Sequence, residues 1–222
     1  MPSSDDARPV DYIGGPVRRL FMRYPWHVSA VVGVLLITGL RPCTRHVPDA
    51  PPVVGAMPGF TLQGAGGEAR SLGDLAGHVW IAGFVAVDAA GPDGEVGEAL
   101  VALAAKSRTH DKPMRFLAIG SRADRDTPDA LAAWATARGL ERPRCEWLAG
   151  PQGDTDKIRA QLVSTFGAQT SEVWAHVFII DDRGKLRGAY PLGERGVDEA
   201  YHRAQHVARD SRAAASTSAG NR

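Results

Sequence analysis

Cysteine is scarce in this chain. Only Cys43 and Cys145 occur among 222 residues, and they do not form a CxxC or CxxxC pair. The sequence therefore contains no local dithiol redox motif. A disulfide between them would need their Cα atoms to lie close together, and nothing in the spacing supports one.

An excess of charge of either sign is also missing. Lys and Arg number 26 and Asp and Glu number 25, so the formal net charge is +1. This balance excludes a global basic field for nucleic acid and the acidic excess of a solvating disordered chain, so we expect no nucleic-acid partner. The glycine-rich stretch at 64–67 lacks a following Lys-Ser/Thr pair and is interpreted as a turn, not a phosphate loop.

Long apolar runs are rare, and the one near the N-terminus is short. Residues 24–40 carry no charge and lie at the lower limit of length for a helix that spans a bilayer. Tyr24 and Trp26 stand where an interfacial aromatic belt is expected. Basic residues are more numerous before the run than after it: Arg18, Arg19 and Arg23 against Arg41 and Arg45. We therefore predict a cytoplasmic segment at 1–23 and a transmembrane signal anchor at 24–40.

The residues around this run disfavour three other interpretations. A cleaved signal peptide is disfavoured by the long polar segment before the run and by the poor cleavage junction at Arg41-Pro42. A lipoprotein is disfavoured because the same two residues precede Cys43 where a lipidation signal wants small ones. A buried core helix leaves the basic flanks unexplained. An uncleaved anchor is preferred, although the sequence leaves cleavage and the role of Cys43 open.

The rest of the chain divides into three parts. Prolines stiffen a linker at 41–52, and a single domain follows at 53–209. Hydrophobic residues make up 44% of the chain, enough for one core. Residues 210–222 are small and polar and are predicted to be disordered.

Two nearly continuous apolar stretches predict strands that are covered on both faces. They lie at 79–87 and 114–120. Between them, Val96, Leu100 and Leu103 fit the apolar face of a crossover helix. Strand, helix and strand at this spacing predict a βαβ unit with a parallel pair and a right-handed crossover.

Further elements follow along the chain. Thr127 is a candidate N-cap with Pro128 at the first helical position. A helix at 156–166, a hairpin around Arg183-Gly184 and a closing helix at 197–209 complete the domain.

Cys145 lies in an alternating segment that predicts a strand. We interpret it as a small buried apolar residue. A reactive thiol remains the alternative, because Arg142 and Arg144 are close in sequence and cationic neighbours activate cysteine.

Three local patterns are distinctive: the entry at Phe60, the Asp126-Thr-Pro sequence and the Asp181-x-x-Gly184 hairpin. Together they resemble the Sco/SenC family of membrane-anchored copper and thiol proteins, and the likeness covers residues 53–209. It implies an α/β, thioredoxin-like fold, with a central mixed sheet flanked by helices, preceded by one N-terminal transmembrane helix.

The same resemblance implies where a copper site would lie. The family carries two cysteines, four residues apart, on the turn after its first buried strand. Register on Gly91-Pro92 places Ala89 and Asp93 at these positions. The family histidine falls on Val173, or on Trp174 if the register slips by one. Alanine and valine carry no donor, and a hard carboxylate binds Cu(I) poorly.

Two weaker ligand candidates remain. His176 lies three residues after Val173, an odd step that points its side chain to the opposite face of a strand. Cys145 is the other. Asp93, which precedes a predicted helix, is expected to serve as its N-cap.

These observations lead to an expected function. We expect a single-pass protein of the bacterial inner membrane, with its domain in the periplasm, that has lost copper and redox chemistry and is not an enzyme. By resemblance it would assist cytochrome c oxidase assembly or copper delivery by contacting an oxidase subunit or a Sco-like partner. The alternative is an active copper chaperone or thiol-disulfide protein using Asp93, His176 and Cys145 as substitute ligands. A peroxidase or reductase would need an activated cysteine at the strand-to-helix turn, where none occurs.

Overall fold

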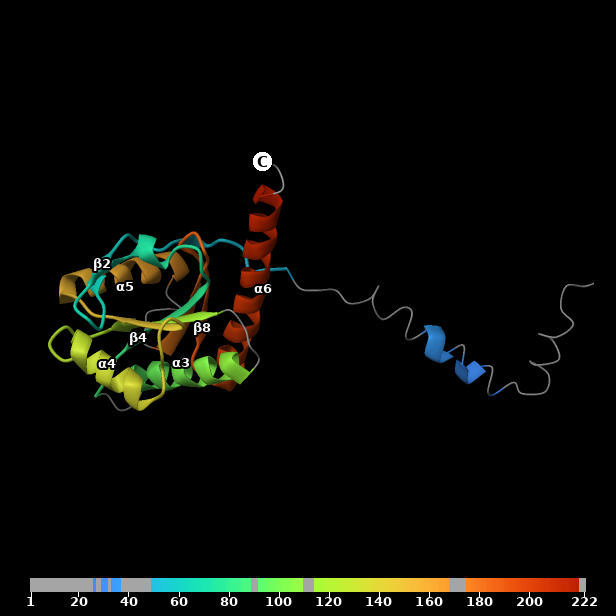
Figure 1. Cartoon of the computed structure of the whole chain (residues 1–222), viewed down its shortest axis with the longest axis horizontal. Helices are drawn as coiled ribbons and strands as arrows, with labels where there is room; N and C mark the ends of the chain where they lie inside the picture. Colours follow the sequence, from blue (N-terminus) through green and yellow to red (C-terminus); the bar gives the residue numbers. More distant parts are fainter. Residues whose placement is uncertain are drawn as a thin grey trace, which may run out of the picture. The chain divides into compact units, whose positions relative to one another are not determined.

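The chain divides into two units, Met1–Pro48 and Asp49–Arg222. The computed structural model describes residues 26, 29–31, 33–36, 49–88, 92–109, 114–167 and 175–219 (Figure 1). In the first unit the described residues are helical, and they include exposed Trp26 and Leu35. None of the helices in these ranges is long and apolar enough to cross a membrane. The other residues of the predicted anchor, together with Cys43, lie outside the described residues.

The second unit is built on a six-stranded mixed sheet in the order β1-β8-β7-β4-β5-β6. Three strands are parallel: β4 (Trp80–Val85), β5 (Arg115–Gly120) and β6 (Cys145–Leu148). Three add antiparallel partners: β7 (His176–Ile180), β8 (Lys185–Pro191) and β1 (Gly55–Ala56). The predicted βαβ unit and terminal hairpin are confirmed.

Helices cover both faces of this sheet, as Figure 1 shows. One face carries α3 (Pro92–Thr109), α4 (Pro128–Ala137) and α6 (Glu194–Ala219). The other carries α5 (Gln152–Phe166), the hairpin of β2 (Thr61–Gln63) and β3 (Ala69–Ser71), and the 3-10 helix η1 (Leu72–Leu75). Each face has its own apolar core, which explains why the central strands are apolar at every position.

Strand β4 divides its side chains between the two cores. Ile81 and Val85 face the α3 side, whereas Trp80 and Phe84 face the α5 side. Gly83 interrupts the large side chains because a Cβ there would come within 2.4 Å of Cγ1 of Val96. The glycine therefore lets α3 approach the strand closely.

Helix α4 begins as predicted. The hydroxyl of Thr127 accepts a hydrogen bond from the backbone N–H of Ala130 at 3.2 Å, and proline follows at the first helical position. The prediction for Asp93 is wrong in one respect. Helix α3 already begins at Pro92, so Asp93 lies inside the first turn and not at the N-cap. Proline prefers the first helical position because its missing N–H would have no partner there.

The structure differs from the prediction at both ends of the domain. Helix α6 continues to Ala219 through residues predicted to be disordered at 210–222. Alanines at 213–215 favour helix, and Ser211 donates a hydrogen bond to Asp182 at 2.8 Å. At the other end, Arg187 donates to the carbonyl of Pro51 at 3.0 Å, so the domain begins before residue 53.

Candidate functional site

The candidate site lies at the edge of the sheet where the parallel strands end. Strand β4 leaves the sheet through residues 86–88, and α3 starts at Pro92. Strand β7 pairs antiparallel with β4, so its first residue, His176, lies at the same edge. The topology therefore brings the first turn of α3 and the start of β7 together, as the resemblance implied.

The structure describes only part of the predicted site. Ala89 and Val173 lie outside the described residues, as does the side chain of Asp93. His176 is half-buried as the first residue of β7. The neighbouring groups that are described show what chemistry this edge supports.

Asp126 is the central polar residue of this edge, and only 1% of it is exposed. Its carboxylate accepts hydrogen bonds from the backbone N–H groups of Val87 at 3.0 Å, Ser121 at 3.0 Å and Arg122 at 2.7 Å. These donors follow β4 and β5, so one carboxylate ties the two strand ends together. These hydrogen bonds satisfy the acceptor atoms of the buried side chain.

The sequence marked Asp126 only as part of a family pattern and missed this role. A signal was present at Gly120, where a Cβ would come within 2.9 Å of both the Cβ and the carbonyl oxygen of Asp126. Without the fold, however, nothing shows that this glycine faces the aspartate.

Asp88, the last described residue before the turn, is held by two arginines. Arg125 donates to its carboxylate at 2.6 Å, and Arg122 forms a second ion pair with it. Asp88 is 41% exposed as a side chain, so each pair contributes at most about 1 kcal/mol. The ion pairs fix the direction in which the chain enters the turn.

Helix α5 completes the edge from the other side of the sheet. Gln152 accepts from the backbone N–H of Ala123 at 3.0 Å and donates to Asp156 at 2.9 Å. Arg159 donates to Asp156 at 2.7 Å, and its guanidinium lies 5.3 Å from the ring centre of Phe84. Apart from the imidazole of His176, the described polar side chains discussed at this edge are carboxylates, guanidinium groups and an amide, which bind one another and are not soft metal donors.

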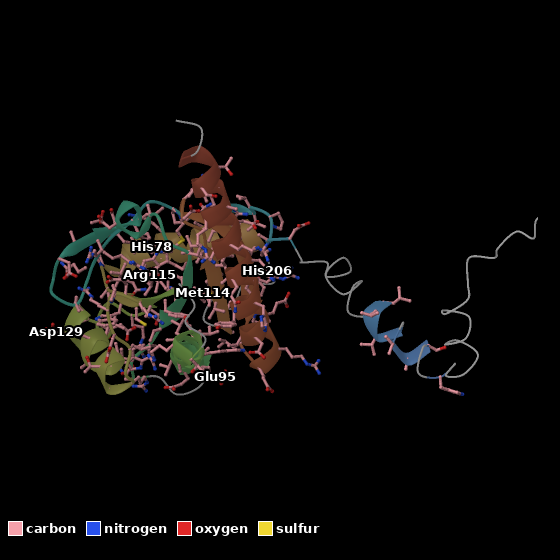
Figure 2. The ribbon with its side chains drawn as sticks, turned by 45° about the vertical axis from the view of Figure 1, so that its right-hand side comes forward. His78, Glu95, Met114, Arg115, Asp129 and His206 are labelled. Carbon is pink, nitrogen blue, oxygen red and sulfur yellow. The ribbon has the colours of Figure 1, made fainter. Side chains whose placement is uncertain are left out.

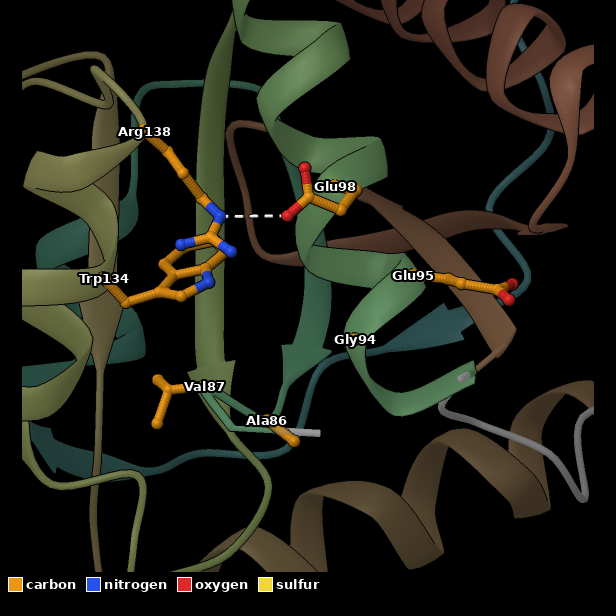
Figure 3. A pocket seen from close by; sticks show the side chains of 7 residues that line it. All are labelled: Ala86, Val87, Gly94, Glu95, Glu98, Trp134 and Arg138. Atoms are coloured by element: carbon orange, nitrogen blue, oxygen red, sulfur yellow. Dashed lines mark hydrogen bonds and ion pairs between the residues drawn. The ribbon is translucent and has the colours of Figure 1, made fainter. Parts of the chain in front are cut away.

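A small cleft lies beside the turn, between α3, α4 and the end of β4 (Figure 3). Its wall is Trp134, and its mouth is spanned by the Glu98–Arg138 ion pair at 2.9 Å. Arg138 also lies 4.9 Å from the Trp134 ring centre, and Glu95 points away from both (Figure 3). The cleft holds about 210 Å³, which is below the usual range for small-molecule sites.

Cys145 is a buried strand residue, as predicted. It begins β6 and is 3% exposed. Burial raises the pKa of its thiol to about 11, which outweighs the opposing effect of nearby arginines. The thiol is therefore protonated at neutral pH, which disfavours the reactive alternative.

The substitute ligand set is not assembled by the fold. Cys145 pairs with Phe116, which pairs with Ile81, so it lies toward the opposite end of the parallel strands from the turn. Strand β6 is also separated from β7 by β5 and β4, a lateral distance of about 14 Å. Cys145 and His176 therefore cannot bind one metal ion. Among the residues that the structure describes, no group of three or more His, Cys, Asp or Glu side chains could hold a metal ion.

Comparison with known proteins identifies solved structures that share this fold. No family model matches the chain, and no curated protein matches it. Among solved structures, BsSco, a member of the Sco family of cytochrome c oxidase assembly proteins, superposes with a TM-score of 0.59 at 18% identity, covering 73% of this chain and 98% of that one. The chain has the fold of the Sco proteins.

A second solved structure agrees. A SCO1/SenC family lipoprotein from Bacillus anthracis str. Ames has a TM-score of 0.59 at 16% identity, over 71% of this chain and 97% of that one. At these identities the likeness shows the fold. The predicted resemblance to the Sco/SenC family is thereby confirmed in its architecture, including the mixed sheet flanked by helices.

Proposed function

We propose that this protein is a membrane-anchored Sco/SenC-like factor that acts by binding in cytochrome c oxidase assembly or copper delivery, without redox chemistry of its own. One observation carries the proposal. A Sco-type fold spans residues 49–219, yet Ala89, Asp93 and Val173 occupy the positions that the family resemblance assigns to its two thiols and its histidine.

These residues do not fit copper. Cu(I) prefers thiolate and imidazole donors, whereas alanine and valine offer none and aspartate offers a hard oxygen. Cys145 does not compensate, because it is protonated and lies toward the other end of the parallel strands. We therefore propose that the protein has no resident cofactor and is not an enzyme.

The retained edge supports a binding role. Asp126 and the ion pairs of Asp88 hold the strand ends in place without thiols or metal. A partner that recognises the shape of this edge can therefore bind it without a thiol or a metal ion. The partner that follows from this proposal is an oxidase subunit or a thiol-bearing Sco-like protein.

The membrane anchor is part of the same proposal. It rests on the uncharged run at 24–40 with its basic N-terminal flank and on the exposed apolar side chains of the described helical residues Trp26, Val34 and Leu35. We propose a single pass through the bacterial inner membrane, with the domain in the periplasm. Carbonate extraction checks retention, and a periplasm-active reporter fused after Arg222 checks orientation.

A complementation experiment tests the binding role. The gene is deleted, and oxidase content and activity are measured in membranes after expression of the wild-type chain or of a cysteine-free chain carrying Cys43→Ala and Cys145→Ala. We expect the deletion to lower oxidase content and both chains to restore it, since neither thiol is used.

The control is the amount of folded protein in the membrane, measured for both chains. A cysteine-free chain that accumulates normally but fails to restore the oxidase would overturn the non-redox role. An unchanged oxidase after deletion, under copper-limited as well as copper-replete growth, would overturn the assignment to oxidase assembly.

A further inference from the structure

A groove lies between α3 and α6, on the same face of the sheet as the Trp134 cleft. It holds about 400 Å³. Its floor is apolar and formed by Ala99, Ala102, Leu103 and Val197. Leu103 is buried, and Ala102 is exposed. Small side chains on the floor let another chain approach the two helices closely.

The rim of this groove is acidic. The lining residues include Glu98, Glu194 and Asp198, against the single ammonium group of Lys106, and the described lining thus carries a net charge of minus two. Lys106 is already engaged, because it lies 2.5 Å from Asp198 and 4.8 Å from the ring centre of Tyr201. Glu98 is held by Arg138 at 2.9 Å, so the rim carboxylate that an incoming cation would meet is that of Glu194 at the start of α6.

The groove adjoins the candidate site. Glu98 lines both the groove and the Trp134 cleft, so the two hollows border the same residue of α3. Figure 2 shows α3, with Glu95 labelled, beside α6. A partner bound at the strand-end turn can therefore extend along α3 into the groove.

We infer that this groove docks a basic amphipathic segment of the partner protein, with apolar side chains on the alanine floor and Lys or Arg at the rim. The inference rests on the proposed binding function and names the chemistry of the partner. An amphipathic segment laid between two helices is a recurring mode of recognition. Complementary charge at the rim adds specificity and speeds association. An anionic lipid surface would instead be repelled by these carboxylates.

Binding of a model peptide tests the inference. The probe is a fluorescent helical peptide of Leu and Lys, compared with its analogue carrying Glu for Lys, and binding to the full chain in detergent is followed by anisotropy. We expect the basic peptide alone to bind. Ala102→Arg, which fills the floor with a cation, should weaken its Kd at least tenfold, and Glu194→Lys several-fold, the latter less at high salt.

Matched controls lie on α4. Ala133 is an exposed helical alanine like Ala102, and Asp129 is an exposed acid in a first helical turn like Glu194. Ala133→Arg and Asp129→Lys should leave the Kd unchanged. Equal weakening by these controls, or equal binding of the acidic peptide, would overturn the inference.

A photocrosslinker at position 102 in the native membrane identifies the occupant. We expect a crosslink to a Lys- or Arg-bearing apolar segment of another protein. A crosslink to a second copy of this chain would overturn the inference and make the groove a self-association surface. If deletion leaves the oxidase unchanged while the peptide still binds the groove, the oxidase role fails and the docking surface stands.

Discussion

The two ends of the parallel strands give a buried polar side chain different surroundings. At the end beside α3, the side chain of Asp126 is buried and accepts hydrogen bonds from three backbone N–H groups. Toward the other end, Cys145 is buried as a neutral thiol, and desolvation raises its pKa to about 11. The comparison shows that the position of a buried polar group in the fold decides which partners compensate its burial.

The difference also explains why the cysteine does not restore the missing chemistry. A thiol becomes reactive where positive potential stabilises the thiolate, as at the strand-to-helix edge. That edge is instead occupied by groups engaged with one another, such as Asp88 with Arg125. The described cysteine lies where burial suppresses ionisation.

The largest effect is expected from restoring soft donors to the edge. The variant Ala89→Cys/Asp93→Cys/Val173→His should retain one Cu(I) per full-length chain against a competing chelator, whereas the unmodified chain should retain none, because thiolates and imidazole suit Cu(I). Copper is measured by competition with a chromogenic chelator. A control with cysteines at the same spacing on α4, Ala133→Cys/Ala137→Cys, should bind it less tightly. Stoichiometric copper on the unmodified chain contradicts the lost-site interpretation.

Removing the buried carboxylate should cost the most stability. Asp126→Ala leaves backbone donors after β4 and β5 without a partner, and we expect a loss of about 3–5 kcal/mol in the free energy of unfolding. Denaturant unfolding measures it. Asp124→Ala, an exposed neighbour on the same turn, should change stability by no more than about 0.5 kcal/mol. Equal effects of the two substitutions would show that the network does not hold this edge.

The buried thiol should make stability sensitive to alkaline pH. Because the folded-state pKa of Cys145 is raised from 9.0 to about 11, its contribution is complete below pH 9 and is lost as pH rises through 11. The loss should reach roughly 2–3 kcal/mol. The check is the difference in unfolding free energy between wild type and Cys145→Ala from pH 8 to 11.5, in which other titrations cancel. A flat difference means that the thiol is not desolvated.

The smallest effect is expected at Asp93. Asp93 belongs to the first turn of α3, where the helix dipole favours an acidic residue, so we expect Asp93→Ala to cost about 0.3–1 kcal/mol. Denaturant unfolding with and without added divalent ions measures this, and Asp129→Ala in the first turn of α4 is the matched control. Protection by an ion that disappears in Asp93→Ala would indicate a metal site in place of a helix-terminal role.

Much of the fold was predictable because short stretches of sequence are enough to indicate its helices and strands. The apolar runs of β4 and β5 and the Thr127-Pro128 start of α4 each carry a short-range signal, and the structure confirms them. The end of α6 was not predicted, since its polar C-terminal residues resemble a disordered tail while their helix propensity and the Ser211–Asp182 bond favour helix.

The candidate site was predicted less completely. The sequence indicated which family positions lack donors, because that needs only register along the chain. It did not reveal that Asp126 receives N–H groups from the ends of two strands, or that the groove between α3 and α6 is acidic. These features join residues that are distant in sequence, and periodicity carries no information about such pairs.

The sequence by itself determined the fold class, the apolar strands and the lack of a local thiol pair, because each depends on residue type and spacing within one segment. Only the tertiary structure decided that Cys145 and His176 lie on strands separated by two others and that Asp126 is buried against three backbone N–H donors. The physical reason is that strand order sets the distance between two side chains, and burial sets how well each side chain is solvated. Those two quantities, and not the presence of a residue, decide whether side chains can share a ligand or carry a charge.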